Sequence, residues 1–286
     1  MTPRVERGPL PPAPKPLRTN VIDSHCHLDI AGGESWPAVT RALADAQEVG
    51  VAGIVQIGCD LPSADWAVQA AERFEAIVAG VALHPNEAPR IVAEQGVSAL
   101  ESAYEQIDQL AAHPRVRVIG ETGLDFFRTG VEGRAVQEQS FRRHIQLAKK
   151  HGKPLMIHDR DSHDDVLRVL EDEGAPDSVV FHCFSGGPGM ARACVERGYV
   201  LSFAGTVTFK NADELRGALR ETPVEQLLVE TDAPFLTPTP YRGQTNASYL
   251  IPLTLRAMAE VKGVDEDHLA GAIASTAASI FGPFWG

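Results

Sequence analysis

The sequence predicts an α/β protein of the (βα)8 class, a TIM barrel. The chain has 286 residues, 44% of them hydrophobic, which is enough to bury the core of one such barrel. Short aliphatic or β-branched runs alternate along it with longer amphipathic runs, as parallel strands joined by crossover helices do. Histidines and acidic residues lie near the ends of several strand-like runs, where barrels carry their reactive groups.

The alternation predicts each element in turn. Strands are expected at residues 21–29, 53–58, 77–83, 116–123, 154–158, 178–183, 199–202 and 227–230. Helices are expected at residues 37–49, 62–74, 97–112, 135–151, 163–173, 188–197 and 213–220, with two more at 249–262 and 265–275. These elements form a single domain over residues 19–286.

Residues 1–18 are predicted to be a disordered tail. Prolines at positions 3, 9, 11, 12, 14 and 16 alternate with basic residues, a composition that does not form a packed element. A proline-rich ligand for a partner domain is the alternative interpretation of this segment.

Charge and cysteine content restrict the function. A formal net charge of -12 and a pI near 5.3 argue against a protein that coats nucleic acid with a broad basic surface. A nuclease is still compatible, because bound divalent cations add positive charge inside a cleft. The four cysteines form no CxxC pair and are expected to be reduced. With no membrane-spanning stretch and no secretory signal apparent, a cytoplasmic location is expected.

His25 and His27 are the most informative pair of residues. They lie two residues apart on a predicted strand, so their side chains project from the same face and can chelate a metal, while Cys26 points to the other face. Four more candidate ligands lie near the ends of later strands: Glu121, His158, His182 and Asp232.

Imidazoles and carboxylates together suit Zn, Mn or Mg, and six such ligands exceed the needs of one open catalytic site. The sequence therefore predicts two divalent ions, with Glu121 bridging them. His25, His27 and Asp232 would hold one ion, and His158 and His182 the other. Such ions activate a water molecule, and Asp232 is the candidate to orient it and accept its proton. Alternatively, each carboxylate caps the helix that follows it, and each histidine is a satisfied polar residue.

These residues lie in motifs through which the chain resembles the TatD family of metal-dependent deoxyribonucleases, within the amidohydrolase-like barrels. The resemblance extends from about residue 21 to 281. Its motifs are DSHCHLD at 23–29, LHP at 83–85, GETGLD at 120–125, PLMIH at 154–158, HCFSG at 182–186 and ETDAP at 230–234.

The resemblance implies a divalent-metal phosphodiesterase that trims DNA from its 3′ end and prefers single strands. It assigns metal binding to the six ligands above and places His84 at the rim, in contact with a phosphate or a leaving group. With Glu121 and Asp232, His84 thus completes the predicted catalytic residues. A polar residue that merely ends the third strand before Pro85 is the alternative for His84.

Substrate contacts are expected from cationic and amide side chains near the strand ends. These are Arg160, Lys210, Arg242 and Asn246. Phe184, Phe203 and Phe209 are available to stack a base, with barrel packing as the alternative for each.

The chain departs from the family pattern at four positions near this path. They are Asn86, Asp159, Gln244 and Thr245, and each change reduces positive charge around the expected phosphate path while leaving the six ligands intact.

Three functions remain open from the sequence. The leading one is a nuclease whose substrate is DNA, which the resemblance implies to be single-stranded. The second is an esterase or amidohydrolase on a small molecule or an aminoacyl-tRNA ester. The third is a non-catalytic scaffold that binds a partner through its tail. No membrane association and no obligate protein partner are predicted.

Overall fold

The computed structural model describes residues 9–32 and 35–284. Its eight strands form one parallel sheet in sequence order. They are β1 (Val21–Cys26), β2 (Val51–Gly58), β3 (Ile77–Val81), β4 (Val116–Asp125), β5 (Leu155–Arg160), β6 (Val179–Phe181), β7 (Val200–Phe203) and β8 (Leu227–Val229). The sheet closes where Asp232 N–H donates to His25 O (2.9 Å) and His27 N–H donates to Ala233 O (2.8 Å). The predicted TIM barrel is confirmed.

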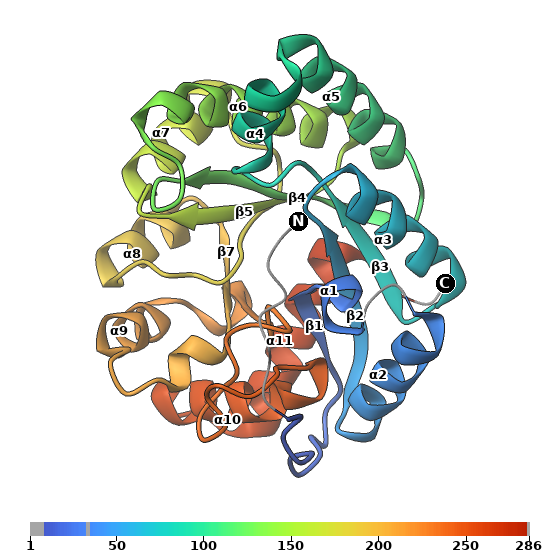
Figure 1. The fold of residues 1–286 in the computed structure, drawn as a ribbon. Helices are drawn as coiled ribbons and strands as arrows, with labels where there is room; N and C mark the ends of the chain where they lie inside the picture. Colours follow the sequence, from blue (N-terminus) through green and yellow to red (C-terminus); the bar gives the residue numbers. More distant parts are fainter. Residues whose placement is uncertain (1–8, 33–34, 285–286) are drawn as a thin grey trace.

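Helices surround the sheet (Figure 1). They are α1 (Leu28–Gly32), α2 (Trp36–Glu48), α3 (Leu61–Arg73), α4 (Glu87–Gln95), α5 (Val97–Ala111), α6 (Val131–His151), α7 (His163–Glu173), α8 (Pro188–Glu196), α9 (Asp213–Glu221), α10 (Ile251–Lys262) and α11 (Glu266–Phe281). Three 3-10 turns are η1 (Gly205–Thr208), η2 (Val224–Gln226) and η3 (Ser248–Leu250). Two helices, α1 with five residues and α4 with nine, were not predicted: α1 begins at the end of the strand expected at residues 21–29, and α4 lies in a segment that was expected to be a loop.

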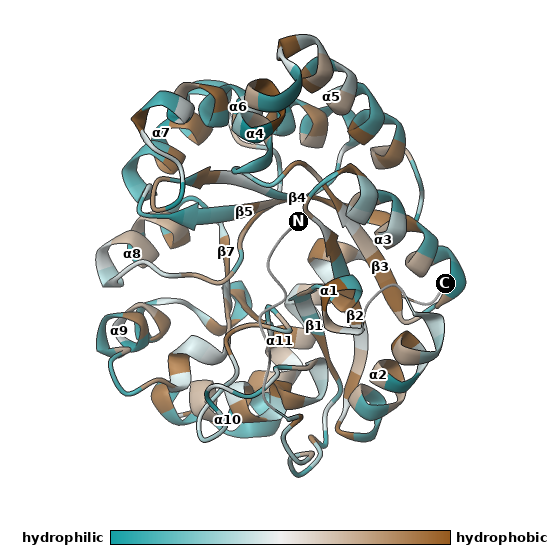
Figure 2. Ribbon diagram, in the orientation of Figure 1, coloured by the Kyte–Doolittle hydropathy of each residue, from teal (hydrophilic) through white to brown (hydrophobic). Residues whose placement is uncertain are grey.

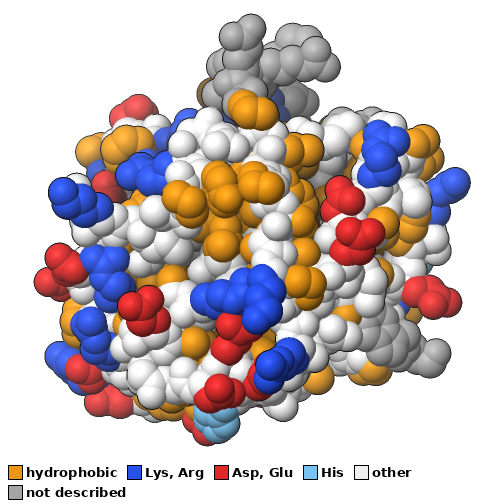
Figure 3. All heavy atoms as spheres, turned by 90° about the horizontal axis from the view of Figure 1, so that it is seen from below, with side chains coloured by type: hydrophobic (Ala, Val, Ile, Leu, Met, Phe, Trp, Pro, Cys, Tyr) orange, Lys and Arg blue, Asp and Glu red, His pale blue; other side chains and the backbone are white. Residues whose placement is uncertain are grey.

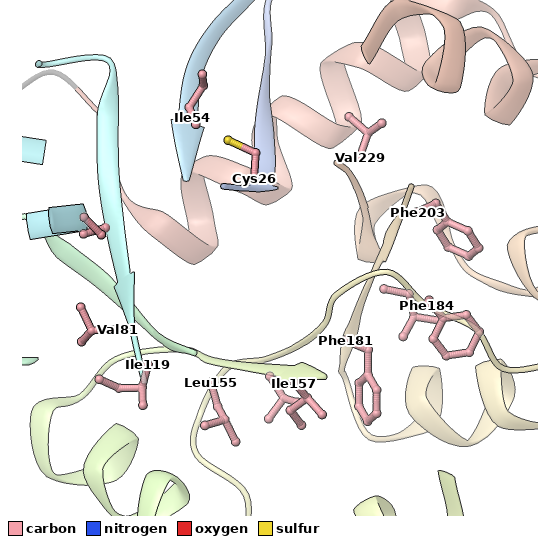
Figure 4. Close-up of a cluster of buried hydrophobic side chains, with 14 of the residues drawn as sticks. Cys26, Ile54, Val81, Ile119, Leu155, Ile157, Phe181, Phe184, Phe203 and Val229 are labelled. Atoms are coloured by element: carbon pink, nitrogen blue, oxygen red, sulfur yellow. The ribbon is translucent and has the colours of Figure 1, made fainter. Parts of the chain in front are cut away.

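Two apolar layers fix the barrel. The larger layer lies between the strands and the helices, and Figure 4 shows part of it. Figure 2 shows the hydrophobic positions along the strands and helices. The smaller layer fills the barrel interior with strand residues such as Ile22, Val55 and Leu228, and Phe281 of α11 packs beneath them. Because this apolar plug fills the amino-terminal end, polar groups gather at the carboxyl-terminal end.

The prediction of a disordered tail is wrong for residues 9–18, while residues 1–8 lie outside the described part. Leu17 is buried and donates its N–H to Val49 O (3.0 Å). Tyr249 Oη–H donates to Pro11 O (2.6 Å), and Arg256 Nη2 donates to Lys15 O (2.8 Å). Prolines lack N–H donors but keep carbonyl acceptors, so an extended proline-rich segment can be held by donors from the barrel.

Figure 3 views the molecule from below Figure 1, on the side where the blue segment that begins at residue 9 and helix α10 lie. Hydrophobic side chains gather near the centre of this face, with Lys, Arg, Asp and Glu side chains around them. Among the described residues, no helix is long and apolar enough to span a membrane.

Candidate metal centre

The six predicted ligands meet at the carboxyl-terminal end of the barrel. His25 lies in β1 and His27 directly follows it, Glu121 lies in β4 and His158 in β5. His182 and Asp232 follow β6 and β8. Asp232 has a φ of 51°, a left-handed conformation that an aspartate adopts only at some cost and that occurs preferentially at functional sites.

The first set of donor atoms comes from both ends of the chain. His25 Nε2 lies 3.2 Å from His27 Nε2 and 3.7 Å from Asp232 Oδ1. His27 Nε2 lies 3.4 Å from Asp232 Oδ1, and Glu121 Oε1 lies 3.6 Å from both imidazole nitrogens. Tetrahedral ligands about 2.1 Å from an ion are separated by about 3.4 Å, so this set fits a zinc-sized cation.

The second set uses the other oxygen of the same glutamate. Glu121 Oε2 lies 2.8 Å from His182 Nε2 and 3.0 Å from His158 Nδ1, and these two nitrogens are 3.3 Å apart. His84 Nε2 lies 3.9 Å from the same oxygen. The two oxygens of Glu121 therefore face two donor sets, as those of a bridging carboxylate do. The sets adjoin, because donor atoms of His25, Glu121 and His182 also lie within 4.8 Å of one another.

The electrostatics favour bound cations. Burial alone would raise the pKa of Glu121, but His182, His84 and His158 outweigh it and hold the pKa well below its usual value. Burial lowers the pKa of His27, yet the hydrogen bond with Asp232 and the charge of Glu121 raise it to about 9. The ionised carboxylates buried among these imidazoles thus favour the binding of cations in the centre.

Two outer carboxylates that sequence reasoning missed orient the histidines. Asp125 Oδ2 lies 3.5 Å from His158 Nε2, and Glu230 Oε1 lies 3.3 Å from His182 Nδ1. Both acids are buried. Metal-binding histidines are commonly held this way through the nitrogen that faces away from the ion. The sequence did contain a sign of this role, because each acid lies in the same motif as a metal ligand: Asp125 with Glu121 and Glu230 with Asp232.

Glycine at position 123 allows the approach of β4 to β5. Gly123 has a φ of 137°, and any side chain there would collide with the carbonyl oxygen of His158. The motif that contains Glu121 therefore requires glycine to bring His158 beside that carboxylate.

Cys59 contacts the centre although no cysteine was assigned a role. Its thiol donates to Glu121 Oε1 (3.2 Å). Burial and the nearby Glu121 raise the pKa of this thiol well above its usual value, so it acts as a donor and not as a thiolate. Cys26 lies in the outer apolar layer, as predicted from strand alternation.

His84 is a neutral imidazole. Its Nδ1 accepts the N–H of Asn86 (3.1 Å), so the ring proton is on Nε2, which faces Glu121. Burial lowers the pKa of His84 to about 3 despite the opposing charge of Glu121. The residue can donate a hydrogen bond from Nε2 without carrying a charge.

Asn246 is not available to a substrate, which corrects that prediction. It is buried, and its Nδ2 donates to Thr231 O (2.8 Å) and Phe235 O (2.6 Å). These bonds hold the chain on both sides of Asp232. The amide therefore shapes the loop that carries a ligand.

One of the three cationic candidates ends a strand, and the other two lie in loops. Arg160 ends β5 and lies over the ring of Phe127, and Arg242 lies over the ring of Phe209. Lys210 is exposed in the loop after η1.

Two of the three aromatic candidates belong to the packing. Phe184 and Phe203 are buried, with ring centroids 5.8 Å apart, and Figure 4 shows them beside Phe181. Phe209 remains available for stacking and is the ring under Arg242.

A parallel barrel with buried imidazoles and carboxylates gathered at its carboxyl-terminal end is the architecture of metal-dependent hydrolases. Residues 22–282 match the family model described as TatD related DNase, and the chain belongs to this family. It is a metal-dependent hydrolase of the TatD family.

Relatives and solved structures agree with this assignment. The metal-dependent hydrolase TatD of Mycobacterium tuberculosis is 45% identical over 269 residues, which cover 93% of this chain and 99% of the relative. The metal-dependent hydrolase YabD of Bacillus subtilis is 34% identical over 91% of this chain and 98% of its own. The crystal structure of the TatD homolog YJJV from Escherichia coli superposes with a TM-score of 0.82 at 26% identity, covering 91% of this chain and 97% of that one.

Proposed function

We propose that this hydrolase is a deoxyribonuclease that removes nucleotides from the 3′ end of DNA with the help of two divalent ions, Zn, Mg or Mn. The observation that carries the proposal is that the two carboxylate oxygens of Glu121 face different histidines. Oε1 faces His25 and His27, and Oε2 faces His158 and His182. Two-metal centres of this kind suit phosphodiester hydrolysis, because they can stabilise both the attacking and the leaving oxygen.

When bound, the ions supply an activated water molecule and polarise the phosphoryl group. Asp232 is the residue that accepts the proton of that water. Burial raises the pKa of this carboxyl, but the hydrogen bond with His27 and the charges of the histidines lower it below its usual value. Asp232 is therefore ionised and can act as a base.

His84 is the candidate to donate to the leaving oxygen. Its Nε2 proton faces the second donor set, and Nδ1 is held by Asn86 N–H. The neutral imidazole can donate a hydrogen bond to the leaving oxygen and so stabilise the negative charge that develops there.

DNA as the substrate is supported by the family description, TatD related DNase, and by cations at the end of β5 and in the loops after η1 and β8. Arg160, Arg242 and Lys210 provide positive charge there on a chain whose formal net charge is -12. Four free cysteines support a reducing compartment, so we place the activity in the cytoplasm.

An esterase or amidohydrolase using the same centre is the second candidate. It is favoured by Asp159, which follows the ligand His158 and accepts hydrogen bonds from Ser162 (2.8 Å) and His163 (2.7 Å). A carboxylate in this position lowers the positive charge available to phosphates. The third reading, a scaffold with a free tail, loses its basis where residues 9–18 pack on the barrel.

The test is digestion of single-stranded DNA labelled at its 3′ or 5′ end by metal-loaded protein, beside a generic ester. We expect metal-dependent loss of the 3′ label, abolished in His158→Ala and retained in His268→Ala, which alters a histidine on α11 away from the centre. Ester turnover with intact DNA would transfer the assignment to the second candidate.

A further inference from the structure

We propose that two arginine–phenylalanine pairs, Arg160 on Phe127 and Arg242 on Phe209, are stacking platforms that bind single-stranded nucleic acid on two sides of the metal centre. This inference rests on the proposed function and specifies its substrate as a strand of several nucleotides. We call the two pairs the β5 platform and the β8 platform.

The geometry of the pairs is alike. Arg160 Cζ lies 3.9 Å from the centroid of the Phe127 ring, and Arg242 Cζ lies 4.0 Å from that of Phe209. At such distances a guanidinium plane covers one face of the ring. The pair then presents a flat surface with a positive charge, to which a base and its phosphate are complementary.

Exposure supports a binding role for the first pair. The side chain of Phe127 is 62% exposed, whereas Phe141, Phe181, Phe203 and Phe281 are buried. Phe127 lies two residues after β4, at the same end of the barrel as the metal centre. A large ring exposed beside a reactive centre is typical of a ligand contact.

Charge pairing supports both platforms. Within residues 9–32 and 35–284, neither Arg160 nor Arg242 has a carboxylate oxygen within 4.0 Å. Seven of the other sixteen arginines in the same part of the chain do have such partners: Arg18, Arg90, Arg142, Arg168, Arg192, Arg216 and Arg256. In an acidic protein, guanidinium groups left without acids at the reactive end remain available to an anionic ligand.

The strand order places the platforms on different sides of the centre. Arg160 lies two residues beyond His158, so strand alternation directs both side chains to the same face. Arg242 lies in the loop after β8, ten residues beyond Asp232, and Phe209 directly follows η1. Figure 1 shows β5 in the upper part of the barrel and α9, which begins just after Phe209, in the lower part.

This arrangement selects for chain length and for unpaired bases. A strand of several nucleotides offers bases and phosphates for both platforms as well as for the metal centre, whereas a small ester offers neither. A duplex hides its base faces in stacking, whereas a single strand can lay a base on each ring and a phosphate against each guanidinium. Base stacking on an aromatic side chain contributes about 1–3 kcal/mol per base.

The experiment compares the affinity of metal-loaded protein for two fluorescent, hydrolysis-resistant phosphorothioate probes, a dinucleotide and an oligonucleotide of about twelve nucleotides. Wild type is expected to bind the longer probe more tightly. Phe127→Ala and Phe209→Ala should each weaken that binding about 5- to 100-fold. Phe127→Tyr should restore it, because tyrosine keeps the stacking surface. Arg160→Ala should also reduce the salt dependence, by about 0.7 in the slope of log K against log salt.

Arg73→Ala is the matched control. Arg73 lies over the Trp36 ring, 5.4 Å from its centroid, at the end of α3 away from the metal centre. The inference is overturned if the platform variants bind the longer probe as wild type and Arg73→Ala do. Binding that depends on the platforms without cleavage of ordinary DNA would instead remove the proposed nuclease activity and leave the platforms standing.

Discussion

Asn86 donates a hydrogen bond from Nδ2 to Asp125 Oδ2 (3.0 Å), and the same oxygen of Asp125 lies 3.5 Å from His158 Nε2. The other end of the amide, Asn86 Oδ1, accepts from Thr129 (2.8 Å) and Gln137 (3.1 Å). A partly buried network that includes Gln137 of α6 and Thr129 of the loop after β4 thus holds the carboxylate that orients a metal ligand. One departure from the family pattern has in this way become part of the support of the centre.

Asn86→Ala is therefore expected to weaken binding of the ion held by His158 and His182. Loss of a group that orients a ligand typically costs about 10- to 100-fold in metal affinity. Titration calorimetry with Mn²⁺ measures the change, and Asn211→Ala, in an exposed loop, is the control. Equal affinities in both variants would show that the network does not support the centre.

Glu121→Gln should reduce the metal content of the purified protein. The amide keeps the shape of the side chain but loses the charge and one acceptor oxygen, so it cannot bridge two ions. Elemental analysis should give about two ions per chain for wild type and at most one for the variant. Glu94→Gln, whose side chain is 54% exposed and pairs with Arg90, should keep the wild-type content. A full complement in Glu121→Gln would contradict the bridging role.

Stability should fall in mild acid because of His144. Its Nε2 accepts Leu83 N–H (3.0 Å), and Nδ1 donates to Ser140 O (2.8 Å). Burial lowers the pKa of His144 to about 4 from its usual 6.5, although the bond to Ser140 opposes this. Between these pH values the unfolded chain binds a proton that the folded chain does not, so the contribution is complete above pH 6.5 and is lost as pH falls toward 4.

Urea unfolding of metal-free protein at several pH values measures this effect. His144→Gln keeps a donor and an acceptor but does not titrate, so its stability should lose about 3 kcal/mol less than that of wild type over the range. Parallel pH profiles for the two proteins would exclude His144 as the cause.

The segment before the barrel should contribute to stability through Leu17. Leu17→Ala removes a buried side chain and should lower the free energy of unfolding by about 2–4 kcal/mol. Leu10→Ala, at a position 62% exposed, should change it by less than about 0.5 kcal/mol. Thermal or urea unfolding distinguishes the two, and equal stabilities would mean that the packing of residues 9–18 is not maintained in solution.

The barrel was predictable because alternation of strands and helices and the position of ligands at strand ends are local patterns. The pairing of His25 with His27 follows from a two-residue spacing alone. Their distance from Asp232 depends on closure between β1 and β8, which no local pattern encodes but which the barrel class implies.

Contacts made through loops were not predictable in the same way. Asn246 is of a residue type that often contacts substrates, yet its side-chain amide donates hydrogen bonds to two backbone carbonyl oxygens. Cys59, which directly follows β2, reaches the centre from a segment in which no motif marked it. Phe127 is an exposed aromatic, and exposure is a property of the folded chain that sequence composition does not contain.

The most direct measurement is anomalous scattering from crystals of the Mn²⁺-loaded protein. Two peaks are expected at the carboxyl-terminal end of the barrel with the carboxylate of Glu121 between them, one beside His25, His27 and Asp232 and the other beside His158 and His182. A single peak, or two peaks that do not share Glu121, would contradict the bridged two-metal centre on which the proposed function rests.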